Sequence, residues 1–192
     1  MRVVRIALLP VLALVAAMLF IAIPASAAGE NYVALGDSYS SGTGAGDYGD
    51  SGSCKRSANS YAQLWADAHS VNSFTFAACS GAVTSDVLNG QISSLSGDTN
   101  FVTITIGGND AGFSNVMIDC ITSSDQGCID RVNEAKAFAE STLPGRLDDV
   151  YSAIKSAAPS ADVVVLGYPR FYQVPGSCSV GLSDTKRTAP PT

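Results

Sequence analysis

Short apolar and β-branched runs recur along the chain and predict β-strands. Each run is nearly continuous in apolar character, which is typical of a strand that is covered on both faces of its sheet. The predicted strands comprise residues 32–35, 74–77, 101–106 and 163–166.

Helical periodicity fills intervals between these strands. The first pattern starts at Tyr61 and places apolar side chains at i, i+3, i+4 and i+7, on one face of a helix. A less regular pattern covers residues 87–95, and a third covers residues 143–158 and ends before Pro159. The segments therefore alternate between strand and helix.

This alternation predicts the fold class. Strand, helix, strand, helix is typical of right-handed βαβ crossovers, which build a parallel sheet with helices on both faces. We therefore expect a three-layer α/β/α domain. The glycine- and serine-rich residues 40–53 form a predicted loop that either shapes a binding edge or is a simple surface excursion.

The start of the chain has the three parts of a secretory signal. Two arginines precede an almost unbroken apolar stretch over residues 6–23, which ends in an Ala-x-Ala exit. We expect cleavage after Ala27, a single domain over residues 28–192 and a secreted, extracellular protein. The alternative, an uncleaved membrane anchor, is less favoured because the stretch is near the lower length limit for spanning and Pro10 interrupts it.

Charge limits the class of partner. Removal of residues 1–27 lowers the basic count from 11 to 9 against 17 acidic residues, which changes the formal net charge from −6 to −8. A polyanion gains no counterion release on DNA, and no basic cluster overrides the average. We therefore expect neither nucleic acid nor an anionic membrane as a partner.

All five cysteines follow the predicted signal, in a chain bound for an oxidising space, so disulfides are expected. The short interval between Cys120 and Cys128 indicates a bridge that closes a small loop. No Cys-x-x-Cys spacing occurs and the chain has a single histidine, so we expect no zinc site. The cysteines are Cys54, Cys79, Cys120, Cys128 and Cys178.

Three predicted strands lead directly into turns with chemically useful groups. Ser38 follows the first, Gly81 the second and Asn109 the third. The carboxyl ends of parallel strands meet at one edge of a sheet, so these turns should share one site. A serine and a carboxamide there suit acyl transfer, with Ser38 as nucleophile and an oxyanion hole made by the N–H groups of Ser38 and Gly81 and by the Asn109 side chain. Glycine at 81 leaves room for the reacting carbonyl.

Four sequence blocks carry a family resemblance. They are G-D-S-Y-S-S-G at residues 36–42, A-C-S-G-A at 78–82, I-G-G-N-D at 106–110 and G-Y-P-R-F-Y at 167–172. In this order they resemble the SGNH hydrolases, also called GDSL esterases and lipases, and especially secreted actinomycete lipases and esterases.

The resemblance implies a flavodoxin-like parallel sheet. It also implies a monomeric enzyme, without metal or cofactor, that hydrolyses small esters or lipids through an acyl-enzyme on Ser38. It also implies a pairing of four cysteines, which is Cys54 with Cys79 and Cys120 with Cys128.

The resemblance further implies a C-terminal block with the histidine that acts as general base. That block would lie beyond Thr192, as would the disulfide partner of Cys178. We therefore expect a domain that is incomplete at its C-terminus, with exposed apolar surface and with Cys178 free to form intermolecular disulfides. The alternative function is accordingly a catalytically impaired relative that keeps an ester- or glycan-binding crevice.

Four further residues are candidates with a structural alternative. His69 is the only histidine, but it ends a helix that should place it at the opposite edge of the sheet from Ser38, so we expect a structural role. Asp37 could serve the site or stabilise its turn. Asp110 could cap the helix that begins there. Arg170 could bind a substrate carboxylate or be a solvated loop residue.

Overall fold

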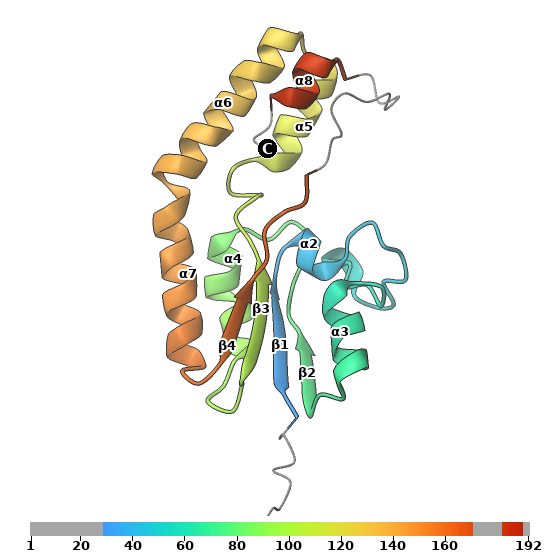
Figure 1. Ribbon diagram of the computed structural model, residues 1–192, viewed down its shortest axis with the longest axis vertical. Coiled ribbons are helices and arrows are strands. Elements are labelled where there is room, and N and C mark those ends of the chain that lie inside the picture. The colour runs from blue at the N-terminus through green and yellow to red at the C-terminus, as the bar shows by residue number, and fades with distance from the viewer. Residues whose placement is uncertain (1–28, 171–181, 190–192) are drawn as a thin grey trace, which may run out of the picture.

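The computed structural model describes residues 29–170 and 182–189. Their centre is a parallel sheet with strand order β2-β1-β3-β4 (Figure 1). The strands are β1 (Asn31–Gly36), β2 (Ser73–Phe76), β3 (Phe101–Thr105) and β4 (Asp162–Val165). The predicted α/β fold with a parallel sheet is confirmed, and each strand end lies within one residue of the position expected.

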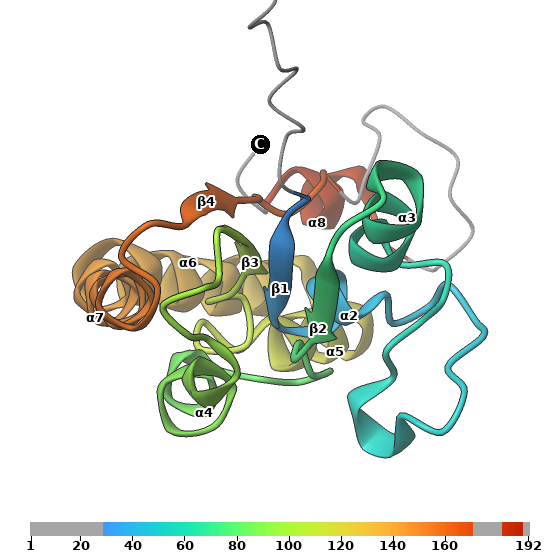
Figure 2. The same ribbon diagram turned by 90° about the horizontal axis from the view of Figure 1, so that it is seen from below.

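Helices cover both faces of this sheet, as Figure 2 shows in the view along the strands. Helix α3 (Tyr61–His69) lies on one face, and α4 (Thr84–Asn89) and α7 (Leu143–Ala157) lie on the other. Helix α3 begins at Ser60, whose side chain accepts a hydrogen bond from the N–H of Gln63. Helix α7 has proline in its first turn, where the missing N–H has no cost.

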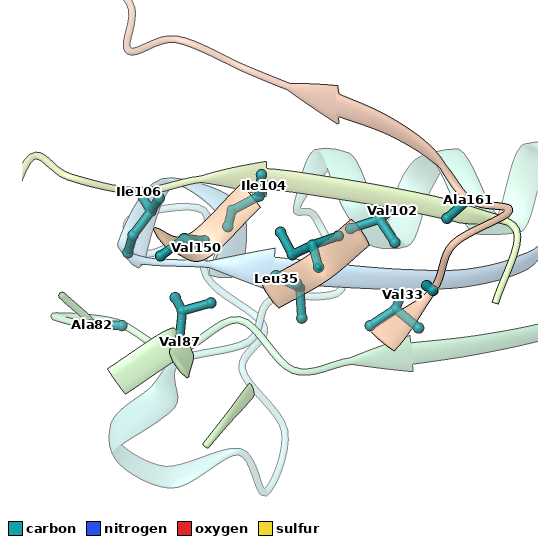
Figure 3. Packing of buried hydrophobic residues seen from close by; sticks show 11 residues of the cluster. Val33, Leu35, Ala82, Val87, Val102, Ile104, Ile106, Val150 and Ala161 are labelled. Atoms are coloured by element: carbon teal, nitrogen blue, oxygen red, sulfur yellow. The ribbon is translucent and has the colours of Figure 1, made fainter. Parts of the chain in front are cut away.

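The face under α4 and α7 holds the larger apolar core (Figure 3). Leu35 of β1 pairs in register with Ile104 of β3, and both side chains are fully buried. Val87 of α4 and Ile154 of α7 are buried against the same cluster. Alternate residues of the strands thus pack against residues that lie on one face of each helix.

The opposite face is aromatic. Tyr32 of β1 is fully buried, and its ring lies 5.1 Å from that of Trp65 and 4.9 Å from those of Phe74 and Phe101. The hydroxyl of Tyr32 has a buried partner in Thr103 Oγ1 at 2.7 Å. The aromatic group therefore fixes α3 to the amino half of the sheet without leaving a buried polar atom unpaired.

The helical pattern over residues 87–95 is broken in the structure. Helix α4 ends before Gly90, and a separate short helix, η2 (Gln91–Ser94), follows. Glycine is the least favourable residue, apart from proline, in a helix interior, which explains the break.

The sequence pattern did not predict two long helices. They are α5 (Phe113–Thr122) and α6 (Asp125–Ser141), the longest helix described. They pack on one another, on Leu182 and on α8 (Asp184–Thr188), beyond the carboxyl ends of the strands (Figure 1). Because these helices do not pack on the sheet, α6 buries only Cys128 and Val132 and shows no broad apolar face.

Disulfides join both expected cysteine pairs, which are Cys54 with Cys79 and Cys120 with Cys128. The second links α5 to α6. Cys178 and the predicted signal over residues 1–27 lie outside the described residues. Within residues 29–170 and 182–189 no helix combines the length and apolar character that crossing a bilayer requires.

A matched pair of leucines tests the core. Leu35→Ala should lower the free energy of unfolding by about 2 to 5 kcal/mol, because it opens a cavity between the central strands and the helices. Leu64 on α3 is 54% exposed, and Leu64→Ala should change that free energy by no more than about 0.5 kcal/mol. Urea titration of both variants measures the difference. Equal effects would show that Leu35 is not part of a packed core.

Candidate active site

The turn after β1 carries Ser38. Asp37 caps the short helix α2 (Ser38–Ser41), because its Oδ1 accepts a hydrogen bond from the N–H of Tyr39 at 3.0 Å. Ser38 is the first residue of that helix and is half-buried. The N–H of Asp37 donates to the carbonyl oxygen of Thr105, at the end of β3, at 2.9 Å. The turn is therefore held against the neighbouring strand.

Gly36 makes this close approach possible. It has a φ of +120°, and an added Cβ would collide with the backbone of Thr105 and the side chain of Ser40. The carboxamide of Gln91 binds both backbone groups of Gly36: Oε1 accepts its N–H at 2.7 Å, and Nε2 donates to its carbonyl at 2.8 Å. No sequence pattern indicated this role for Gln91, since a single glutamine after a glycine gives no signal of it.

The turn after β2 carries Gly81. The N–H of Cys79 donates to the carbonyl of Gly36 at 3.0 Å, and the N–H of Ser80 donates to that of Cys54 at 3.0 Å. The disulfide between Cys54 and Cys79 reinforces the second contact. Hydrogen bonds and a covalent bond therefore fix the backbone that leads into Gly81.

Gly81 itself is exposed and has a φ of +85°, a conformation that favours glycine. Apart from Gly81 and its two chain neighbours, no residue has an atom within 4 Å of the position that a Cβ would take, so that position faces open space. A pocket of about 430 Å³ lies against this turn and is lined in part by Ser80, Gly81 and Gln91. The lining of this pocket does not include Ser38 or Asn109, so the pocket lies beside the turns that carry these two residues and does not enclose them.

The turn after β3 carries Asn109. Its side-chain Nδ2 donates a hydrogen bond to the carbonyl of Ala82 at 2.9 Å, which ties this turn to the one with Gly81. A carbonyl can pair only with the NH₂ end of a carboxamide, so this contact fixes which way the amide faces. A carboxamide nitrogen carries two N–H groups, so the same side chain can donate to a second acceptor.

Asp110 does not cap the helix that follows it, contrary to expectation. Helix α5 starts only at Phe113, after Gly112. The buried carboxylate of Asp110 instead accepts hydrogen bonds from the N–H of Thr84 at 2.9 Å and from its hydroxyl at 2.6 Å, at the start of α4. Arg146 pairs with it at 3.1 Å. Asp110 therefore caps a helix from a different part of the chain, which sequence adjacency could not indicate.

The turn after β4 reaches the same edge. Tyr168 donates its hydroxyl hydrogen to Asp37 Oδ2 and accepts a hydrogen bond from the N–H of Gly108 at 2.9 Å. Arg170, two residues further, is exposed. Four strand ends thus contribute to one edge of the sheet.

Burial raises the pKa of Asp37 above its usual range, since only 1% of the residue is exposed. Hydrogen bonds from Tyr168 and from the backbone act in the opposite direction without cancelling the effect. The negative charge of Asp110 adds to the rise. These contacts support the structural alternative for Asp37, which stabilises its turn.

His69 lies far from these turns along the sheet. Its ring stacks on Trp65 at 4.1 Å between centroids, and Nδ1 is 2.8 Å from the Trp65 carbonyl oxygen. Trp65 in turn contacts Phe101, the first residue of β3, at 4.5 Å between ring centroids. His69 therefore belongs to the amino edge of the sheet, opposite Ser38.

The chain is similar to proteins of a known family. Residues 34–189 match the model of the GDSL-like Lipase/Acylhydrolase family, and the chain belongs to that family. It is 58% identical over 164 residues to Lipase 1 of Streptomyces coelicolor, an alignment that covers 85% of this chain and 61% of that protein.

Two solved structures share the fold. Phospholipase A1 from Streptomyces albidoflavus NA297 superposes with a TM-score of 0.82 at 62% identity, over 85% of this chain and 69% of that one. The extracellular lipase from Streptomyces rimosus superposes with a TM-score of 0.80 at 57% identity, over 82% of this chain and 68% of that one. The chain thus spans between three fifths and seven tenths of the length of these relatives.

The variant Asp37→Asn should flatten the dependence of stability on pH. Because the pKa of Asp37 is raised in the folded chain, folding favours the protonated carboxyl. The stability that this group contributes is present below its usual pKa of 3.8 and is lost as the pH rises through the raised value. Asparagine keeps the helix cap but cannot ionise.

Urea titrations of both proteins at a series of pH values from 3.8 upward measure this effect. The stability of the unmodified chain relative to Asp37→Asn should decrease as the pH rises. A relative stability that stays constant over this range would mean that the carboxyl ionises at its ordinary pKa.

Proposed function

We propose that this chain provides the nucleophile and the oxyanion hole of a carboxylic ester hydrolase. Ser38 attacks the ester carbonyl, and the N–H groups of Ser38 and Gly81 and the Asn109 side chain bind the oxyanion. The observation that carries the proposal is the set of hydrogen bonds that joins the three turns: Asp37 to Thr105, Cys79 to Gly36 and Asn109 to Ala82.

The chemistry follows in two halves. The Ser38 oxygen forms a bond to the carbonyl carbon while its proton passes to a base, and the oxyanion then collapses and expels the alcohol, which takes up a proton. Water attacks the resulting acyl-Ser38 in the same way and releases the carboxylic acid. Donors fixed before the reaction stabilise the oxyanion without reorganisation at the moment of attack.

Substrate and location belong to the same proposal. Similar proteins are named lipase, phospholipase A1 and extracellular lipase. We accordingly propose an ester or a lipid as substrate, and export directed by residues 1–27. The positive start, the apolar middle and the Ala-x-Ala exit of that segment support export.

A second candidate function has one observation in its favour. Ser38 needs a proton acceptor, and His69, the only histidine of the chain, lies at the opposite edge of the sheet. Loss of a base from a serine triad costs several orders of magnitude in rate. On this alternative the 192-residue chain keeps a crevice that binds an ester or a glycan but does not hydrolyse its ligand.

Ser38→Ala separates the two functions. If the chain is a hydrolase, it should cleave a p-nitrophenyl ester and react covalently with a fluorophosphonate probe, and Ser38→Ala should abolish both. Ser152→Ala, a change to an exposed serine on α7, is the matched control and should leave both unchanged. Ester binding by the unmodified chain without hydrolysis or labelling would support the second function instead.

Asn109→Ala tests the oxyanion hole. Loss of one fixed donor should lower kcat by about 100- to 1,000-fold and change KM little, because the donor acts mainly on the transition state. Asn133→Ala on α6 removes an exposed carboxamide away from the turns and should have the kinetics of the unmodified chain. Steady-state kinetics on a soluble ester give both constants. An unchanged kcat in Asn109→Ala would remove Asn109 from the oxyanion hole.

A further inference from the structure

Tyr168 has no role in the proposed chemistry, yet its hydroxyl lies between the turn that carries Ser38 and the turn that carries Asn109. It donates to Asp37 Oδ2, next to Ser38, and accepts the N–H of Gly108, next to Asn109. Tyr168 lies 131 residues from the first partner and 60 residues from the second, so these contacts join segments that are distant in sequence.

We propose that Tyr168 is a positioning residue whose hydroxyl holds the Asp37–Ser38 turn in register with the Gly108–Asn109 turn. The inference rests on the proposed function for its effect on rate, whereas the bridge between the turns can be tested without catalysis. A nucleophile and an oxyanion donor must share one carbonyl-sized space, so a fixed spacing between their turns is a direct requirement of the reaction.

Gly108 fits this role. A Cβ at residue 108 would lie 2.9 Å from Cζ and 3.0 Å from the hydroxyl oxygen of Tyr168, closer than side-chain carbons pack. Any residue other than glycine at position 108 would therefore push the phenol away from the backbone N–H of that residue, which donates a hydrogen bond to the Tyr168 hydroxyl. The hydrogen bond of Tyr168 thus depends on glycine at position 108.

Burial of the ring does not explain Tyr168. The residue is 40% exposed, and its ring contacts the partly exposed Tyr39 at 6.2 Å between centroids. The hydroxyl, in contrast, reaches a carboxylate that is almost fully enclosed. The interactions that distinguish tyrosine from phenylalanine at this position are therefore the two hydrogen bonds.

The hydrogen bond from the Tyr168 phenol also affects the ionisation of Asp37. The carboxylate receives one hydrogen bond at each oxygen, from Tyr39 N–H at Oδ1 and from Tyr168 at Oδ2. The Tyr168 contact opposes the rise in the pKa of Asp37 that burial causes. Removal of the hydroxyl should raise that pKa further and release the turn at Oδ2.

The test is Tyr168→Phe in the full chain, with two readouts. Amide hydrogen exchange at Gly108 and Tyr39, followed by NMR, should become at least about tenfold faster, because the first loses its acceptor and the second depends on the carboxylate that Tyr168 holds. With a soluble ester, kcat should fall by about 10- to 100-fold and KM should stay within about twofold.

Tyr48→Phe is the matched control, because the Tyr48 hydroxyl accepts the N–H of Gly44 at 2.7 Å in an exposed loop. It should speed exchange at Gly44 and leave Gly108, Tyr39 and kcat unchanged. A second variant, Gly108→Ala, keeps the hydroxyl but displaces it, and should reproduce the loss in kcat and the faster exchange at Tyr39.

The outcomes separate this inference from the proposed function. If the unmodified chain shows no Ser38-dependent hydrolysis, the proposed function fails, and the exchange rates still decide whether Tyr168 joins the turns. Exchange at Gly108 and Tyr39 that is unchanged in Tyr168→Phe overturns the inference. An unchanged kcat in an active chain overturns it as well, because the hydroxyl would then not position the reacting groups.

Discussion

The close pairing of β1 with β3 is the constraint on which the rest of the structure depends. At the end of this pair, the backbone of Gly36 approaches Thr105 so closely that no Cβ fits between them. The chain then turns at Asp37, whose N–H donates to the Thr105 carbonyl. Because the turn begins from this fixed contact, the position of Ser38 follows from the register of the two central strands.

Other turns are built on the same reference point. Gln91 satisfies both backbone groups of Gly36, and Cys79 donates to the same Gly36 carbonyl. The Gly81 turn is therefore placed relative to β1, and the Asn109 carboxamide is placed relative to the Gly81 turn through Ala82. If a buried backbone group lost its partner in this set of contacts, the free energy of unfolding would fall by about 1 to 3 kcal/mol. These contacts therefore hold the turns in fixed positions.

The sequence predicted those parts of the fold that local pattern controls. The central strands β1 and β3 are short, largely apolar runs that are buried along most of their length, so their pattern revealed them. Periodicity also revealed α3 and α7 as helices, but it misplaced the buried face of α3, where Leu64 is exposed and Ala62 and Ala66 are buried. Ser38, Gly81 and Asn109 could be assigned to one edge because parallel topology brings strand ends together. Family resemblance supplied the cysteine pairs, which spacing alone left open for Cys54 and Cys79.

What the sequence could not predict depends on contacts between distant segments. Asp110 caps α4 rather than the helix that follows it, and Gln91 clamps a glycine 55 residues away. Helices α5 and α6 pack mainly on each other beyond the sheet, so their apolar positions serve a small separate cluster and not one continuous face. Tyr168 could be placed after a strand, but its two partners come from turns that only the folded chain brings together.

The bridge between Cys54 and Cys79 links the glycine- and serine-rich loop to the backbone that leads into Gly81. Such a bond forms where thiols are oxidised and is absent where glutathione keeps them reduced. The compartment in which the chain folds therefore decides whether this turn has a covalent brace. Chains made in a reducing cytosol would assemble the same sheet and yet present the Gly81 amide on a looser segment.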